Sequence, residues 1–266
     1  MIKLIVCDVD GTLLPHGEKR ISYDTADLIK EAENKGISFA AASGRAYHEL
    51  KRLFEGINVW YIPSDGAALI YNEETLFKKN IPFFAADKLV KALTETEKTA
   101  AVATGKYMSY IIKGENIDNS FNHRITSVLN GHAVRAENVS EADEDILKLS
   151  FYGGAKSVFG KKLLSGTADN LTKIIYKDGV WTDFVSVNAG KKAAVLKLME
   201  LLKLEADETA VIGDGDNDAD MLKITRNSVA VKGGSESVLK AAKYITSDVN
   251  KTLDFIIRKG EIRDVL

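Results

Sequence analysis

Both ends of the chain alternate between apolar, strand-like runs and helical segments, and this alternation limits the possible folds more than any other feature. Near the N-terminus, apolar runs over residues 3–8 and 37–42 are followed by segments with helical apolar spacing over residues 21–35 and 45–54. Continuous apolar runs are typical of strands buried on both faces of a parallel sheet. The pattern predicts an α/β fold with a doubly wound, Rossmann-like parallel sheet.

The same alternation returns after residue 188. The predicted elements are a helix over residues 191–202, a strand over 209–213, a helix over 219–224, a strand over 228–231 and a helix over 235–242. We therefore expect the two ends of the chain to share one sheet, in a core domain made of residues 1–81 and 188–266.

The middle of the chain, residues 82–187, has a different pattern. One predicted hairpin joins residues 99–103 to 107–113 around Gly105, and another joins 170–177 to 180–187 around Asp178-Gly179, a favoured two-residue turn. Helices are expected over residues 84–97, 116–129 and 155–164. This block predicts an inserted α+β cap domain with crossings near Pro82 and Asn188.

Composition and charge exclude several classes of protein. The 36 Lys and Arg residues are balanced by 38 Asp and Glu residues, so no basic excess is available for a nucleic-acid backbone. No apolar stretch approaches the roughly 20 residues of a membrane span, and the N-terminus does not match a secretory signal. We expect a cytoplasmic protein with a small-molecule partner and no nucleic-acid, membrane or obligate protein partner. The single Cys7 is expected to be a small buried residue of the first strand.

Acidic residues follow two of the predicted strands. Asp8 and Asp10 end the first strand, and Asp214 begins the acidic part of the segment GDGDND after residues 209–212. Ligands of open α/β sheets bind beyond the carboxyl ends of the strands. An Asp-Gly pair by itself can equally mark a plain turn. The second acidic cluster at the same edge favours a binding site over a turn.

Clustered carboxylates require a proton or a cation. Two carboxylates about 4 Å apart repel by roughly 4 kcal/mol at an effective dielectric constant near 20. A hard divalent ion satisfies them, and Mg²⁺ suits a site that also binds phosphate. A calcium loop starting at Asp214 is excluded, because it would need Gly at Ala219 and Glu at Thr225.

Two further segments could bind phosphate. Ser43 and Gly44 lie where a strand gives way to a helix, so free backbone N–H groups and a hydroxyl are available, although a serine there can be a plain N-cap. Lys191 and Lys192 open another helix, where a lysine opposes the helix dipole unless it pairs with an anion. Exposed surface lysines are the alternative. Helical phasing favours Lys191 as the residue that reaches the site.

The motifs occur in a characteristic order: DVDGTLL, then SGR, then the helix-opening lysine, then GDGDND. Over essentially the whole chain, this order resembles the haloacid dehalogenase superfamily of phosphohydrolases. The insertion after SGR and the segment VAVKGGSESVLKAAKYITSD resemble its Cof-type branch, which has a large α/β cap. One departure is Lys192, where the family usually has glycine.

The resemblance implies a Mg²⁺-dependent phosphatase, a phosphoric monoester hydrolase that forms a phosphoaspartate. Its substrates would be small monoesters such as sugar phosphates or phosphorylated cofactors. Asp8 would be the nucleophile and Asp10 the general acid and base. The implied phosphate-binding residues are Val9, Thr12, Ser43, Gly44, Lys191 and Asn217. The implied Mg²⁺ ligands are Asp8, Asp10 through its backbone carbonyl, Asp214 and Asp218, the last of which could instead support Lys191.

Two alternatives remain open at this point. A phosphomutase would return the phosphoryl group of the same phosphoaspartate to a sugar in place of water. A receiver-like binding module would use Asp8 as a phosphorylated switch, but Asp10 would then hasten the loss of the phosphoryl group. The substrate is also open, because the specificity residues are expected within the insertion and the sequence does not single them out.

Overall fold

The computed structural model describes residues 1–15, 17–94, 100–112, 132–152, 171–175 and 181–262. The chain forms two compact units. The first unit comprises residues 1–45, 50–77 and 190–266, and the second comprises residues 46–49 and 78–189. The units therefore divide at residues 78 and 190, where the sequence suggested 82 and 188. The assignment of residues 46–49 to the second unit was not anticipated.

The first unit is built on an eight-stranded sheet of order β14-β13-β12-β1-β2-β3-β4-β5. Its strands are β1 (Leu4–Asp8), β2 (Ser38–Ala42), β3 (Trp60–Ile62), β4 (Ala68–Tyr71), β5 (Glu74–Lys78), β12 (Thr209–Gly213), β13 (Ser228–Val231) and β14 (Tyr244–Thr246). All strands from β14 to β3 pair in parallel, and β4 is antiparallel to β3. The central strand β1 pairs with β2 on one side and with β12 on the other, so both ends of the chain share one sheet, as predicted.

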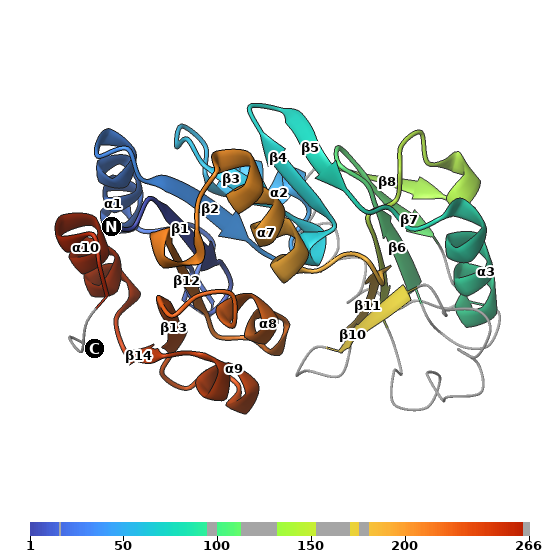
Figure 1. Ribbon diagram of the computed structural model, residues 1–266. Coiled ribbons are helices and arrows are strands. Elements are labelled where there is room, and N and C mark those ends of the chain that lie inside the picture. Colours follow the sequence, from blue (N-terminus) through green and yellow to red (C-terminus); the bar gives the residue numbers. More distant parts are fainter. Residues whose placement is uncertain (16, 95–99, 113–131, 153–170, 176–180, 263–266) are drawn as a thin grey trace. The chain divides into compact units, whose positions relative to one another are not determined.

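Helices cover both faces of this sheet (Figure 1). They are α1 (Tyr23–Asn34), α2 (Tyr47–Leu53), α7 (Lys191–Leu202), α8 (Ala219–Leu222), α9 (Glu236–Ala241) and α10 (Val249–Lys259). Leu4 and Val6 of β1 pack with residues of α7, α8 and α9. The alternate residues Ile5 and Cys7 are completely buried on the other face, because successive side chains of a strand point in opposite directions. There α1 and α10 lie side by side. Apolar cover on both faces therefore holds β1 in the centre of the core.

Several helices begin at a capping side chain, whereas α7 and α8 do not. Ser22 caps α1 by accepting a hydrogen bond from the Thr25 backbone N–H, and Asp248 caps α10 in the same way. The helix α7 begins after Gly190, which offers no capping side chain. The helix predicted over residues 45–54 is shorter in the structure, where α2 begins at Tyr47 and ends at Leu53. Among the described helices, none combines the length and apolar character needed to cross a membrane.

The second unit contains a six-stranded sheet of order β10-β11-β9-β6-β7-β8. Its elements are α3 (Phe83–Thr94), β6 (Ala100–Thr104), β7 (Ser109–Ile112), β8 (Ala133–Ala136), β9 (Lys148–Tyr152), β10 (Leu171–Ile175) and β11 (Trp181–Ser186). The antiparallel pairing of β6 with β7 and of β10 with β11 confirms the two predicted strand pairs. Leu89 of α3 shares a core with Phe151 and Phe184 of the sheet. The helices expected over residues 116–129 and 155–164 lie outside the described residues.

Candidate active site

The carboxyl end of β1 places Asp8 beside a buried lysine. Lys191 Nζ lies 2.5 Å from Asp8 Oδ1 and 2.7 Å from Asp218 Oδ1, and its side chain is only 1% exposed. Lys192, the next residue of α7, is exposed. The helix α7 therefore directs Lys191, and not Lys192, to the acidic residues at the sheet edge.

Three carboxylates lie close together at this edge of the sheet, and two of them, Asp8 and Asp218, contact the Lys191 ammonium group. Asp8, Asp214 and Asp218 each have an oxygen within 4.8 Å of one in each of the others. Burial and, next, the charge of Asp218 raise the pKa of Asp8 well above its ordinary value, and Lys191 offsets part of this effect. Burial lowers the pKa of Lys191, but Asp218 and Asp8 outweigh it and the net pKa is raised, so the lysine keeps its charge. The excess of hard oxygen donors fits a divalent cation such as Mg²⁺.

Glycine allows the two acidic loops to approach each other. Gly11 has a φ of +90°, and a Cβ atom there would lie 2.4 Å from Asp214 Oδ2. Thr12 donates a hydrogen bond of 2.8 Å to Asp214 Oδ1, which joins the loop after β1 to the loop after β12. Asp214 is thus brought next to the Asp8 loop from 202 positions away in the sequence.

Asp218 is fixed by hydrogen bonds on both of its carboxylate oxygens. While Oδ1 pairs with Lys191, Oδ2 accepts bonds of 3.1 Å from the Asp214 N–H and 2.9 Å from the Gly215 N–H. Asp218 therefore holds the lysine and the loop of Asp214 in place together.

The side chain of Asp10 is directed to a different partner. The Arg45 guanidinium donates to both of its carboxylate oxygens, with Arg45 Nε 2.9 Å from Oδ2 and an Arg45 terminal nitrogen 2.6 Å from Oδ1. Ser43 Oγ also donates to Asp10 Oδ2, at 3.3 Å. The Asp10 carboxylate is 46% exposed and lies outside the three-carboxylate cluster. Arg45 was visible in the SGR motif, but its contact with Asp10 was not predicted.

The remaining predicted phosphate ligands lie on loops at the same edge of the sheet. Val9 and Thr12 follow β1, and Ser43 and Gly44 follow β2. Asn217 lies in the short 3₁₀ turn η4 (Asp216–Asp218), where its Nδ2 donates a 2.8 Å hydrogen bond to Asp65 Oδ1. Asp65 was not predicted, because the sequence pattern places it in an ordinary Pro-Ser-Asp-Gly turn.

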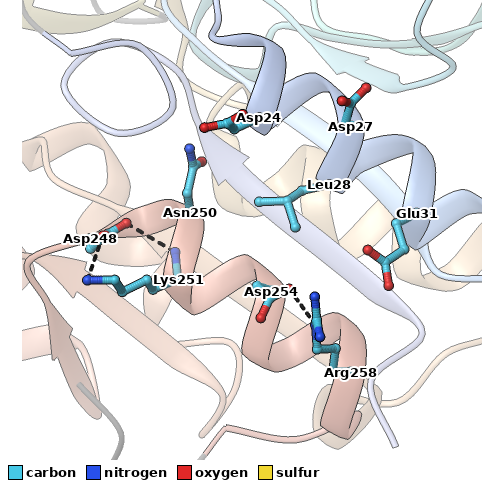
Figure 2. A pocket seen from close by; sticks show the side chains of 9 residues that line it. All are labelled: Asp24, Asp27, Leu28, Glu31, Asp248, Asn250, Lys251, Asp254 and Arg258. Carbon is cyan, nitrogen blue, oxygen red and sulfur yellow. Dashed lines mark hydrogen bonds and ion pairs between the residues drawn. The ribbon is translucent and has the colours of Figure 1, made fainter.

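A hollow of the first unit lies away from these residues. It has a volume of about 520 Å³ and lies between α1 and α10 (Figure 2). Its lining is mostly acidic: Asp24, Asp27, Leu28, Glu31, Asp248, Asn250, Lys251, Asp254 and Arg258. None of the predicted site residues contributes to it.

Comparisons with known proteins define the class to which this fold belongs. The model of the haloacid dehalogenase-like hydrolase family matches residues 5–254, so the chain belongs to that family. It is 26% identical over 278 residues to Phosphatase YwpJ of Bacillus subtilis, a match that covers 92% of this chain and 94% of that protein. It is 25% identical to the 5-amino-6-(5-phospho-D-ribitylamino)uracil phosphatase YbjI of Escherichia coli, with 94% and 92% covered.

Solved structures share the fold over nearly the whole length of the chain. A haloacid dehalogenase-like hydrolase from Bacteroides thetaiotaomicron superposes with a TM-score of 0.82 at 20% identity, covering 96% of this chain and all of that one. The subclass IIB sugar phosphatase BT4131 gives a TM-score of 0.79 at 21% identity, with 98% and 100% covered. The resemblance seen in the motifs is thereby confirmed, and the chain is a phosphatase of this family.

Proposed function

We propose that the chain is a Mg²⁺-dependent phosphatase that hydrolyses small phosphate monoesters through a phosphoaspartate at Asp8. The observation that carries the proposal is the position of Asp8, at the buried end of β1 between Lys191 and two further carboxylates. A carboxylate held by a buried lysine is fixed in direction before the substrate binds, which favours in-line attack.

The reaction has two steps. Asp8 attacks phosphorus, the bond from phosphorus to the ester oxygen breaks, and the Asp10 carboxyl group gives its proton to the departing alkoxide. Asp10, now a carboxylate, takes a proton from a water molecule that attacks the phosphoaspartate, which releases inorganic phosphate and restores Asp8. The exposure of the Asp10 carboxylate supports this role, because it must meet both a leaving group and water.

The proposed metal ligands are Asp8, Asp214 and the backbone carbonyl of Asp10. A bound Mg²⁺ would supply positive charge that offsets the carboxylates and the phosphate oxygens. Both oxygens of Asp218 already bind Lys191 or backbone amides, which favours its supporting role over direct ligation. Lys191, Asn217, Ser43, Thr12 and the backbone N–H groups of Val9 and Gly44 are the proposed phosphate contacts.

The proposed substrates are sugar phosphates or phosphorylated cofactors. One solved relative is described as a sugar phosphatase, and one curated relative acts on a phosphorylated ribitylaminouracil. We assign the choice of leaving group to the insertion of residues 82–187. Its sheet carries a buried ion pair of 2.6 Å between Lys148 and Asp183, so charged side chains occur within the insertion.

The test is release of inorganic phosphate from a panel of alkyl and sugar phosphates. We expect turnover in Mg²⁺, none in excess EDTA, and recovery when Mg²⁺ is restored. Full activity in EDTA would remove the metal from the proposal. Phosphate release that depends on a bisphosphorylated activator would indicate a phosphomutase.

A chimera tests the role of the insertion. Residues 82–187 are replaced by the corresponding segment of a related phosphatase, which should change the preferred leaving group and keep the Mg²⁺ requirement. A folded chimera with the original substrate preference would refute the assignment.

A further inference from the structure

The turn between β3 and β4 has an unusual backbone. Ser64, Asp65 and Gly66 are three consecutive residues in the left-handed region, with φ values of +51°, +55° and +84°. This region is unfavourable for residues other than glycine, and Asp tolerates it better than most. All three residues are buried, and Ser64 Oγ has no hydrogen-bond partner in the described part of the chain. Such strain persists where the surroundings hold it, and it is concentrated at functional sites.

The backbone of this turn is attached to the loop after β2. The Ser64 N–H donates to the Arg45 carbonyl at 2.8 Å, and the Asp65 N–H donates to the Ser43 carbonyl at 3.0 Å. The turn therefore fixes the backbone on both sides of Gly44, in the loop that carries a proposed phosphate ligand.

The same turn also contacts the start of α7. A Cβ atom on Gly66 would lie 2.2 Å from the Gly190 carbonyl carbon and 2.4 Å from the Lys191 nitrogen. Only glycine permits this close approach, so the turn packs directly against the backbone at the start of α7.

The side chain of Asp65 reaches the third segment of the site. Its Oδ1 accepts the 2.8 Å hydrogen bond from Asn217 Nδ2, across 152 positions of sequence. Because Asn217 Nδ2 is the donor, the NH₂ group of the carboxamide faces Asp65. One N–H of that group then donates to Asp65, and the direction of the second N–H follows because the amide is planar.

We propose that Asp65 is a positioning residue that orients the Asn217 carboxamide so that its second N–H can bind a substrate phosphate oxygen. The turn of residues 64–66 then links the three segments that carry Ser43, Lys191 and Asn217. This inference rests on the proposed phosphatase function, within which it assigns a residue that makes no substrate contact of its own.

The experiment replaces Asp65 by glycine, which adopts a positive φ without strain and removes only the side chain. The readouts are KM and kcat for p-nitrophenyl phosphate, the inhibition constant of inorganic phosphate, and Tm. We expect KM and the inhibition constant to rise about tenfold, as for the loss of one hydrogen bond to a charged group, with kcat changed by less than about threefold and Tm not lowered. Lys203→Gly is the matched control, because Lys203 also has a positive φ of 55° and ends α7 outside the site.

A double variant identifies the route of the effect. If Asp65 acts through Asn217, the inhibition constant of the Asp65→Gly/Asn217→Ala protein equals that of Asn217→Ala alone. Should Asp65→Gly fail to fold, Asp65→Asn replaces it in the same cycle, because an amide can donate as well as accept and no longer dictates the orientation of Asn217. We expect a rise of about threefold for that variant.

Three results would overturn the inference: an unchanged inhibition constant, losses that add in the double variant, or a fall in Tm and kcat with unchanged phosphate inhibition. The wild-type protein separates this failure from that of the proposed function. A wild type that releases no phosphate from any ester refutes the phosphatase itself, whereas an active wild type with insensitive Asp65 variants refutes only the positioning role.

Discussion

Two aspartates that stand two residues apart in the loop after β1 have opposite surroundings. The Asp8 side chain is 7% exposed and is held by Lys191, which is 1% exposed. The Asp10 side chain is 46% exposed and is held by Arg45, which is 28% exposed. The sequence DVD gives no sign of this difference, which arises from the elements packed around each residue.

The difference matches the two proposed roles. A nucleophile benefits from one fixed direction, and a buried ion pair provides it at the cost of desolvating both charges. An exposed ion pair is worth at most about 1 kcal/mol, so Asp10 can exchange Arg45 for a leaving group or water without large loss. The loop therefore combines a rigid carboxylate with one that is free to change partners.

Asp8→Asn tests the buried aspartate of the pair and should have the largest effect. The amide is nearly isosteric but cannot attack phosphorus, so turnover should fall by at least about 10⁴-fold. Burial raises the pKa of Asp8 in the folded state, so ionising this carboxyl group costs more free energy in the folded protein than in the unfolded chain. The free energy of unfolding therefore falls as the pH rises from the ordinary pKa of an aspartate towards the raised one. In EDTA at neutral pH the variant should therefore melt above the wild type, and the gain should shrink in acid. Substantial activity in protein free of contaminating phosphatase would exclude Asp8 as the nucleophile.

Asp10→Ala tests the exposed aspartate of the pair. Loss of the general acid should slow alkyl phosphates by about 10²–10⁴-fold and aryl phosphates less, because a phenolate leaves without a proton. Rapid quench followed by mass analysis of the peptide containing residue 8 should detect accumulated phosphoaspartate, since the second step lacks its base. Equal losses for both ester types, without trapped phosphoenzyme, would assign Asp10 to the loop geometry alone.

Lys191→Met should reduce kcat by about 10²–10³-fold, as for removal of one donor from a developing charge. It also leaves Asp8 and Asp218 buried without their cation, which should lower the free energy of unfolding in EDTA by about 3–5 kcal/mol. Activity assays and chemical denaturation measure the two effects. Lys192→Met is the matched control, and equal effects at the two positions would contradict the arrangement of α7.

Arg45→Gln should have the smallest effect. Without the bidentate hydrogen bonds from Arg45, the Asp10 carboxylate should sample more orientations. We expect kcat for alkyl phosphates to fall about three- to tenfold with little change in Tm. Arg45→Lys keeps the charge but not the planar fork, so it should lie between wild type and Arg45→Gln. Arg258→Gln, which removes an exposed arginine paired with Asp254, should leave kcat unchanged. A loss as large as that of Asp10→Ala would mean that Arg45 itself acts on the substrate.

The sequence predicted several strands and helices of the first unit from their apolar pattern, but it did not predict the amphipathic helix α10. The runs that became β1 and β12 are continuously buried, β2 is buried after Ser38, and α7 begins and ends at the predicted residues. The strands β3 and β14 have three residues each, too few to show a period, and were not predicted. Short strands of this kind are stabilised by their neighbours in the sheet and not by their own sequence.

The acidic part of the site could be predicted because each motif follows a recognisable strand. Arg45 and Asp65 could not be assigned contacts in this way. Asp65 meets Asn217 only because the β3–β4 turn and the loop after β12 reach the same sheet edge, which depends on tertiary packing. Likewise, the exposure of Asp10 depends on what covers the loop and not on the loop sequence itself.

Cys7, the single cysteine of the chain, lies in β1 directly before Asp8 and is completely inaccessible. Burial, reinforced by the neighbouring Asp8, raises the pKa of its thiol, so the reactive thiolate is suppressed in the folded protein. Alkylation of this thiol consequently requires the central strand to separate from its neighbours. The rate at which Cys7 is labelled should therefore report how often the strand that carries Asp8 opens.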